Sequence, residues 1–258
     1  MILKRYRLLI LAGLILVGGG YLYLHPELFP ARLGVTDYIS PGDTGKIEEH
    51  ANYYDIVVVY ATSTPLRASV GNHSDQVAVG LMKGFITTAI AQFKADGKFD
   101  KLTPKDIEMM GYDEGRKQSL QISHVSAVSP RTVSYVYTLE TYTLGAHGNT
   151  DYKTFTFDLK DGKSLKLEDL FVSGAAYLSQ LSSLTRTSLG AQLEAAPDDP
   201  MIAAGTTPTD TSFQHFFLDD RSLVILFPPY AVASYAAGPQ TVAIPRSELK
   251  DILKPEYQ

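Results

Sequence analysis

The segment Thr141–Phe171, TYTLGAHGNTDYKTFTFDLKDGKSLKLEDLF, constrains the fold of this chain more than any other. It holds a histidine between glycines, then a strand pattern, an Asp-Gly turn and a short LEDLF helical turn. A second segment, Leu226–Pro245, has a loop with two tyrosines that leads into another strand. Neither has the spacing of a catalytic motif, so both indicate the framework of a domain.

The N-terminus predicts a membrane anchor. Leu8–Leu24 is a run of 17 residues without a charge, at the short end of what crosses a bilayer. Lys4, Arg5 and Arg7 precede it, which predicts a cytoplasmic N-terminus and an extracytoplasmic C-terminal domain. A cleaved signal peptide is the alternative, although no Ala-X-Ala follows the apolar run. Both alternatives export the same domain, and the anchor makes the protein a single-pass protein of the cell membrane.

The charge of the chain argues against nucleic acid as a partner. The net charge is −5, and removal of residues 1–24, with three basic and no acidic residues, leaves −8 for the exported part. Nucleic-acid-binding proteins concentrate positive charge instead. An acidic surface favours a cationic partner, or it serves only solubility. The chain has no cysteine, which excludes disulfides and thiol chemistry.

The hydrophobic patterns predict an α+β fold: a mainly antiparallel sheet with two or three packed helices, behind an N-terminal transmembrane helix. Residues 25–52, with several prolines and glycines, are expected to form a stalk, and residues 195–210 a loop. The predicted helices are Asn72–Lys94, a short one from Pro104, Ala175–Leu193 and Arg246–Leu253. The predicted strands are Tyr53–Thr64, Leu120–Val128, Thr132–Thr143, Tyr152–Leu159, Ser164–Leu167, Ser212–Leu218, Leu223–Phe227 and Thr241–Ile244.

The second half, residues 145–258, resembles the RsiV-like extracytoplasmic domain of lysozyme-sensing anti-sigma factors. Residues 53–144 are more loosely similar to the PdaC/RsiV-type module that precedes it, through a tyrosine-rich strand and the long helix. The matching residues of the second half are Gly145-Ala146-His147-Gly148-Asn149, Phe155, Phe157-Asp158, Gly162-Lys163, Leu167, Asp169-Leu170-Phe171, Phe227, Tyr230, Val232-Ala233, Tyr235-Ala236, Gly238 and Ile244-Pro245.

The resemblance implies a binding or sensor module whose ligand is a lysozyme-like protein or peptidoglycan. Only Met1–Arg7 precede the anchor, so we expect no anti-sigma domain. We also expect no deacetylase domain, because residues 53–258 are taken up by the two modules. The expectation is therefore recognition without a built-in response.

The candidate ligand-binding residues are His147, Asn149, Tyr230 and Tyr235. The two tyrosines lie on a loop stiffened by prolines, where they either offer contact area to a ligand or pack onto the sheet. His147 either binds a ligand or stabilises a tight turn, since no short spacing links it to His124 or His215 as a metal or acid–base site. We expect no catalytic residue, metal or other cofactor.

Two alternatives stay open. The first is an enzyme that modifies cell-wall glycan with His147 and nearby carboxylates, for which Asp158, Asp161 and Asp169 are candidates. Turn and helix-start chemistry is the simpler explanation of those three carboxylates. The second alternative is an accessory subunit whose catalytic or signalling partner is encoded separately.

Overall fold

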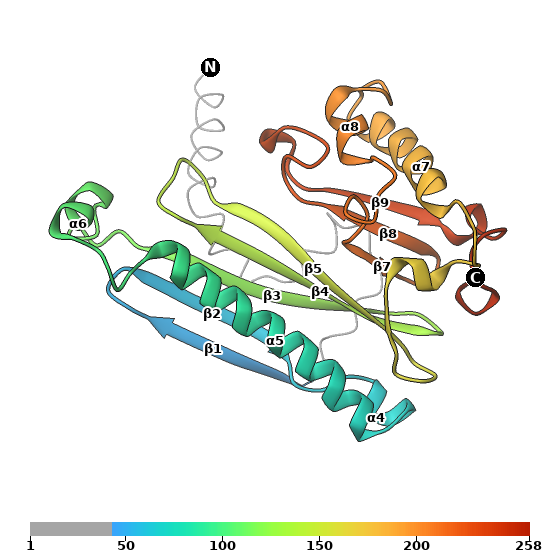
Figure 1. Cartoon of the computed structure of the whole chain (residues 1–258), viewed down its shortest axis with the longest axis horizontal. Coiled ribbons are helices and arrows are strands. Elements are labelled where there is room, and N and C mark those ends of the chain that lie inside the picture. The colour runs from blue at the N-terminus through green and yellow to red at the C-terminus, as the bar shows by residue number, and fades with distance from the viewer. Residues whose placement is uncertain (1–42) are drawn as a thin grey trace, which may run out of the picture. The chain divides into compact units, whose positions relative to one another are not determined.

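The computed structural model describes residues 43–258 (Figure 1). The predicted anchor, and the predicted stalk up to residue 42, lie outside the described residues. Within residues 43–258, none of the helices combines the length and the apolar character that crossing a bilayer requires. The fold is α+β, as predicted, with a six-stranded sheet, a three-stranded sheet and helices packed on each.

The six-stranded sheet has the order β1-β2-β3-β4-β5-β6, and all neighbouring strands are antiparallel except one pair. β2 (Tyr54–Ala61) and β3 (Gln118–Val128) are parallel because a helical crossover joins them. The sheet is therefore mixed, with the predicted antiparallel pairing dominant. The other four strands are β1 (Thr44–His50), β4 (Thr132–Tyr142), β5 (Asn149–Asp158) and β6 (Ser164–Leu165).

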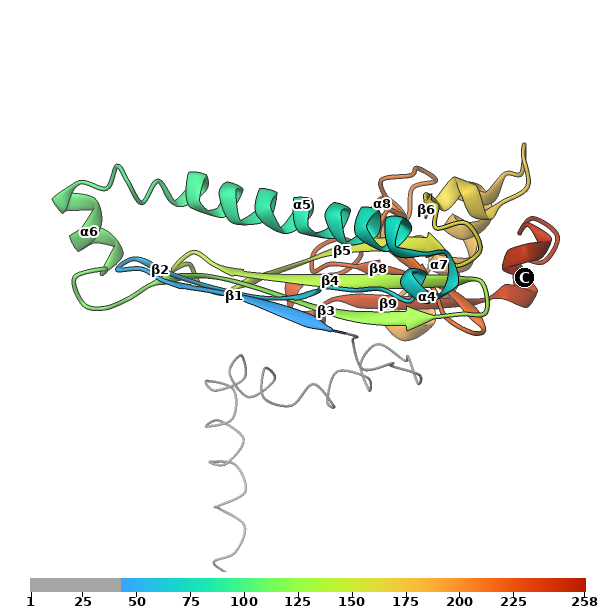
Figure 2. The same ribbon diagram turned by 90° about the horizontal axis from the view of Figure 1, so that it is seen from below.

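The long helix α5 (Asn72–Gly97) covers one face of this sheet (Figure 2). Its side chains Met82, Ile86 and Phe93 are buried against the apolar positions of the strands. The short helix α4 (Leu66–Ser69) precedes it, and α6 (Pro104–Met110) follows it. The strands contribute to this first core Ile56, Val58, Leu120, Ile122, Val133, Tyr135, Tyr137 and Phe157.

The three-stranded sheet has the order β7-β8-β9 and is antiparallel throughout. Helix α7 (Tyr177–Gln192) packs on it, and α8 (Pro200–Gly205) follows. β7 also lies against β4 and β5 of the larger sheet. The strands are β7 (Phe216–Leu218), β8 (Ser222–Phe227) and β9 (Gln240–Pro245), and the second core includes Leu181, Leu189, Ile202, Phe213, Leu223, Ile225, Phe227 and Val242.

The described part of the chain has two apolar cores, but they do not divide at the predicted boundary between residues 144 and 145. β5 and β6 pair into the first sheet, so the β4–β5 hairpin crosses that boundary. The two cores divide instead between Leu159 and Leu165. Phe155 and Phe157 of β5 explain the shift, because both pack under α5.

Three further predictions differ from the structure. The expected stalk includes β1, which pairs with β2 through its backbone although Ile47 is its one apolar side chain packed on the core. The expected loop 195–210 contains α8, which Asp199 caps by accepting hydrogen bonds from two backbone N–H groups. The expected helix Arg246–Leu253 is only a 3₁₀ turn, Arg246–Glu248, because the chain then crosses to form a bridge between Leu253 and Phe171.

Candidate functional site

The β4–β5 hairpin presents His147 at its tip. The ladder closes at the pair Thr141 and Asn149, and residues 143–148 form the loop beyond it. Leu144 has a positive φ of 64°, and the backbone at Gly148 approaches Thr141 so closely that a Cβ would lie 3.2 Å from its carbonyl oxygen. The tight loop leaves the His147 side chain exposed.

The β8–β9 connection, residues 228–239, brings two tyrosines to the same place. Val232 is buried and anchors the loop, whereas Tyr230 is 55% exposed. Tyr230 has a positive φ of 69°, a conformation that a bulky residue adopts only when its surroundings impose it. Tyr235 begins a 3₁₀ turn that ends at Gly238, whose φ is 72°. The loop therefore holds both tyrosines in defined positions.

The three aromatic residues form one surface group, which we call the aromatic cluster (His147, Tyr230 and Tyr235). The His147 and Tyr235 rings are stacked, with centroids 3.7 Å apart and planes at 22°. Tyr230 lies beside them, with ring centroids 5.5 Å from Tyr235 and 6.4 Å from His147. The structure thus brings together three of the four predicted site residues, from two loops far apart in the sequence.

One carbonyl group fixes the stacked pair. The Gly148 oxygen accepts a 2.9 Å hydrogen bond from the Tyr235 hydroxyl and another of 2.9 Å from His147 Nδ1. Donation to a carbonyl places a proton on Nδ1, so Nε2 of the neutral ring is an acceptor, 3.5 Å from the Tyr230 hydroxyl. The group therefore offers flat aromatic faces with hydrogen-bonding edges to a ligand.

The remaining predicted site residue, Asn149, is not part of the aromatic cluster. Its backbone pairs with Thr141, and its side chain makes no hydrogen bond within residues 43–258. It is exposed at the start of β5, one residue beyond Gly148. Its position allows a contact with a ligand on the hairpin tip, but the structure gives it no role in positioning the rings.

The other two histidines considered from the sequence lie in different surroundings. His124 is 8% exposed, stacks on Tyr137 and contacts the Val59 carbonyl through Nδ1 at 3.1 Å. His215 lies beside β5, with Nε2 3.7 Å from Asp151. Burial lowers the pKa of both histidines, which favours their neutral forms. Across residues 43–258, no group of three His, Cys, Asp or Glu side chains is arranged to hold a metal ion.

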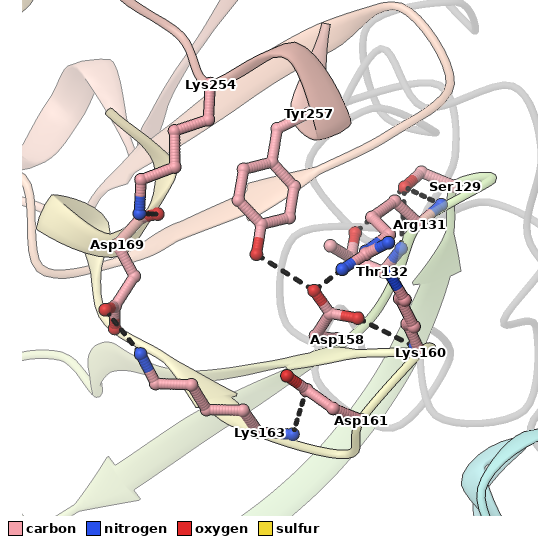
Figure 3. A network of polar contacts seen from close by, with 10 residues as sticks. All are labelled: Ser129, Arg131, Thr132, Asp158, Lys160, Asp161, Lys163, Asp169, Lys254 and Tyr257. Carbon is pink, nitrogen blue, oxygen red and sulfur yellow. Dashed lines mark hydrogen bonds and ion pairs between the residues drawn. The ribbon is translucent and has the colours of Figure 1, made fainter. Parts of the chain in front are cut away.

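The three candidate carboxylates lie at the end of β5 opposite the aromatic cluster (Figure 3). Asp158 is buried and accepts hydrogen bonds from Arg131 Nε at 2.8 Å, the Tyr257 hydroxyl at 2.9 Å and the Lys160 N–H at 2.7 Å. Each of the other two bonds a neighbouring backbone N–H: Asp161 that of Lys163, and Asp169 that of Lys166. They are structural residues of turns and of two ion pairs, Asp158 with Arg131 and Asp169 with Lys163, and they form no composite site with His147.

Comparison with known proteins identifies the C-terminal part. Residues 168–247 match the family described as "Protein of unknown function (DUF3298)". The chain is 36% identical over 127 residues to the peptidoglycan-N-acetylmuramic acid deacetylase PdaC of Bacillus subtilis, across 49% of this chain and 27% of PdaC. It is 27% identical over 136 residues to the immunogenic protein MPT64 of Mycobacterium tuberculosis, across 51% of this chain and 57% of MPT64. Each match thus covers less than two thirds of the relative.

A solved structure shares the fold. The crystal structure of a DUF3298 family member from Bacteroides fragilis matches with a TM-score of 0.56 at 17% identity, over 83% of this chain and 93% of that one. At this identity the likeness concerns the fold alone. The segment that matches the family model, residues 168–247, includes Tyr230 and Tyr235, whereas His147 precedes it. Residues 168–247 therefore match a DUF3298 domain, in a chain distantly related to PdaC and MPT64.

Proposed function

We propose that this chain is an extracytoplasmic binding module of the RsiV-like type, and that the aromatic cluster is its recognition surface. The observation that carries the proposal is the stacked pair of His147 and Tyr235, clamped by one carbonyl, with Tyr230 exposed beside it. Rigid aromatic side chains on loops give large contact areas at a low cost in conformational entropy. A group held in this way is preorganised for binding.

The ligand in this proposal is related to the cell wall: peptidoglycan or a lysozyme-like protein. The name of PdaC states an action on peptidoglycan, and its match to this chain supports the first ligand. The resemblance to lysozyme-sensing domains supports the second, and the net charge of −8 beyond residue 24 favours a cationic protein. The apolar run Leu8–Leu24 would tether the module to the membrane.

No catalytic step is part of the proposal. Within residues 43–258, the hydrogen-bonding partners of the His147 ring are the Gly148 carbonyl and the Tyr230 hydroxyl. The candidate carboxylates Asp158, Asp161 and Asp169 lie at the far end of β5 from His147, so the proposal gives them no acid–base role beside it. A separately encoded partner would supply the response to binding.

The experiment compares the two ligands directly. The full chain, purified in detergent, is mixed with insoluble peptidoglycan in one assay and with immobilised lysozyme in another. We expect one of the two to retain the protein and Tyr230→Ala to reduce the retained fraction. Leu81→Ala, which removes an apolar side chain 45% exposed on α5, is the matched control and should bind like the wild type. Failure of both ligands to retain the protein would refute the proposed ligand class.

A further inference from the structure

A second candidate site lies between the β1–β2 turn and the end of α5. It is a pocket of about 420 Å³ lined by Asn52, Tyr53, Tyr54, Lys94, Phe99 and Asp100. Its volume falls within the range of about 300–1,000 Å³ typical of small-molecule sites. The residues belong to no motif, because a strand turn and a helix end supply them separately.

The aromatic wall of the pocket is rigid. The Tyr54 and Phe99 rings have centroids 4.5 Å apart, and Phe93 packs edge-on against Tyr54 at 6.0 Å. Because Phe93 belongs to the core under α5, this wall is continuous with the interior of the domain. Tyr53 is supported from another side by Tyr112, with ring centroids 5.0 Å apart. A ligand would therefore meet aromatic surfaces that are already in place.

The charges around the pocket favour an uncharged ligand. Lys94 Nζ lies 2.6 Å from a Glu49 carboxylate oxygen and 5.5 Å from the Tyr54 ring centroid. The lysine thus already occupies the cation position over this ring, so a cationic ligand would gain no cation–π contact there. Its own charge is compensated by Glu49, while Asp100 at the rim would repel an anion.

Polar groups at the rim are free to bind hydroxyl or amide groups. Within the part of the chain that the structure describes, the side chains of Asn52, Asp100 and Tyr53 make no hydrogen bond to the protein. We propose that the pocket binds a neutral saccharide unit. Its C–H face would lie on the Tyr54–Phe99 wall, and its hydroxyls would bond Asn52 and Asp100, which together offer donors and acceptors.

The pocket lies at the same end of the sheet as the aromatic cluster. His50 pairs with Asp55 at the β1–β2 turn, which borders the pocket. Ser119 pairs with Tyr142 next to the β4–β5 loop, which carries His147. Arg116, which precedes β3, donates a 3.3 Å hydrogen bond to the Leu144 carbonyl in the β4–β5 loop. Three strand spacings separate the two turns, about 14 Å. The saccharide proposal rests on the pocket alone and therefore stands or fails independently of the proposed function.

The test is a titration of the full chain with chitotriose, a neutral oligosaccharide, by calorimetry and by tyrosine fluorescence, which no tryptophan obscures. We expect saturable binding that Asn52→Ala and Asp100→Asn each weaken at least about fivefold, the loss of one hydrogen bond. Both residues are exposed, so neither change should alter the thermal unfolding temperature. Tetramethylammonium and inorganic phosphate, the charged probes, should give no saturable response.

Two control variants locate the binding. Asp198→Asn removes an exposed carboxylate in the loop after α7, and Leu81→Ala removes an exposed apolar side chain on α5; both should bind chitotriose like the wild type, and Tyr230→Ala is measured beside them. Absence of saturable binding, or equal affinity in the two pocket variants and the wild type, would overturn the proposal. Saturation by either charged probe would contradict the argument for a neutral ligand. Loss of affinity in Tyr230→Ala alone would assign the sugar to the aromatic cluster instead.

Discussion

The Tyr257 hydroxyl donates a 2.9 Å hydrogen bond to the buried Asp158 carboxylate, and so ties the C-terminus to the end of β5 (Figure 3). The same carboxylate oxygen accepts from Arg131, which begins the β4 side of the hairpin. Tyr257 of the second core and Arg131, which flanks a strand of the first, therefore converge on one buried charge. The end of the domain opposite the aromatic cluster is stabilised by this network.

Tyr257→Phe removes one hydrogen bond from Asp158 and should lower the free energy of unfolding by about 1.5–2 kcal/mol, as expected for a bond to a charged group. Asp158→Asn should lower it by about 2–3 kcal/mol, because it removes the buried negative charge to which the partly exposed Arg131 and Tyr257 both donate hydrogen bonds. Urea denaturation measures both. The matched control is Asp198→Asn, an exposed carboxylate, which should change little. Equal effects of Asp158→Asn and Asp198→Asn would contradict the role of the network.

The same carboxylate predicts a dependence of stability on pH. Burial opposes the ionisation of Asp158, but the hydrogen bonds from Lys160, Arg131 and Tyr257 outweigh it, so its pKa lies below the ordinary value of 3.8. A lowered folded pKa gives stability that is complete above the unfolded value and is lost as the pH falls through the folded one. The free energy of unfolding should therefore fall more steeply below about pH 4 in the wild type than in Asp158→Asn. Parallel pH profiles would argue against this assignment.

The packing of α5 predicts a contrast within one helix. Ile86 is 2% exposed against the sheet, so Ile86→Ala should cost about 2–5 kcal/mol through lost burial and the cavity that remains. Val77 is 48% exposed on the same helix, and Val77→Ala should change stability by less than about 0.5 kcal/mol. Urea denaturation of the two variants checks the orientation of α5. A larger effect at Val77 would mean that the helix packs by another face.

Gly205 at the end of α8 predicts a link between that helix and the loop that carries Tyr230. A Cβ at this position would overlap the Ala231 carbonyl oxygen and crowd Val232. Gly205→Ala should therefore displace the loop, lower the unfolding temperature and weaken ligand binding. Gly84→Ala, on α5 with open space around its Cβ, is the control and should raise stability by about 0.5–1 kcal/mol. Unchanged binding and stability in Gly205→Ala would show that the loop tolerates the shift.

The regular elements were predictable from the sequence because their patterns are local. The alternation Val133, Tyr135, Tyr137 marks β4 correctly, and the apolar spacing within Asn72–Lys94 predicts α5, which the structure extends to Gly97. The sequence of β1, TGKIEEH, does not predict a strand, because it has no apolar alternation and its backbone pairing with β2 is what makes it one. The parallel pairing of β2 with β3 depends on a crossover of more than fifty residues, which no local pattern encodes.

The candidate site shows the same division. The sequence indicates His147, Tyr230 and Tyr235 one by one, through their glycine and proline neighbours. Their stacking depends on the second sheet lying beside β5, which is a tertiary contact. No sequence pattern predicts the pocket, because aromatic residues such as Tyr53 and Phe99 are common at the ends of strands and helices. Polar residues such as Asn52 and Asp100 indicate a binding site only once the fold places them beside the aromatic side chains.

The most direct test of the central claim is the affinity of Tyr230→Ala for whichever cell-wall ligand retains the wild-type chain. Tyr230 is exposed and belongs to neither apolar core, so the variant should unfold at the same temperature as the wild type. If the aromatic cluster is the recognition surface, the Kd of Tyr230→Ala for this ligand should rise about tenfold or more. A loss of affinity of this size is typical when an aromatic anchor is removed from an interface. A Kd equal to that of the wild type, with the fold intact, would show that the ligand binds elsewhere.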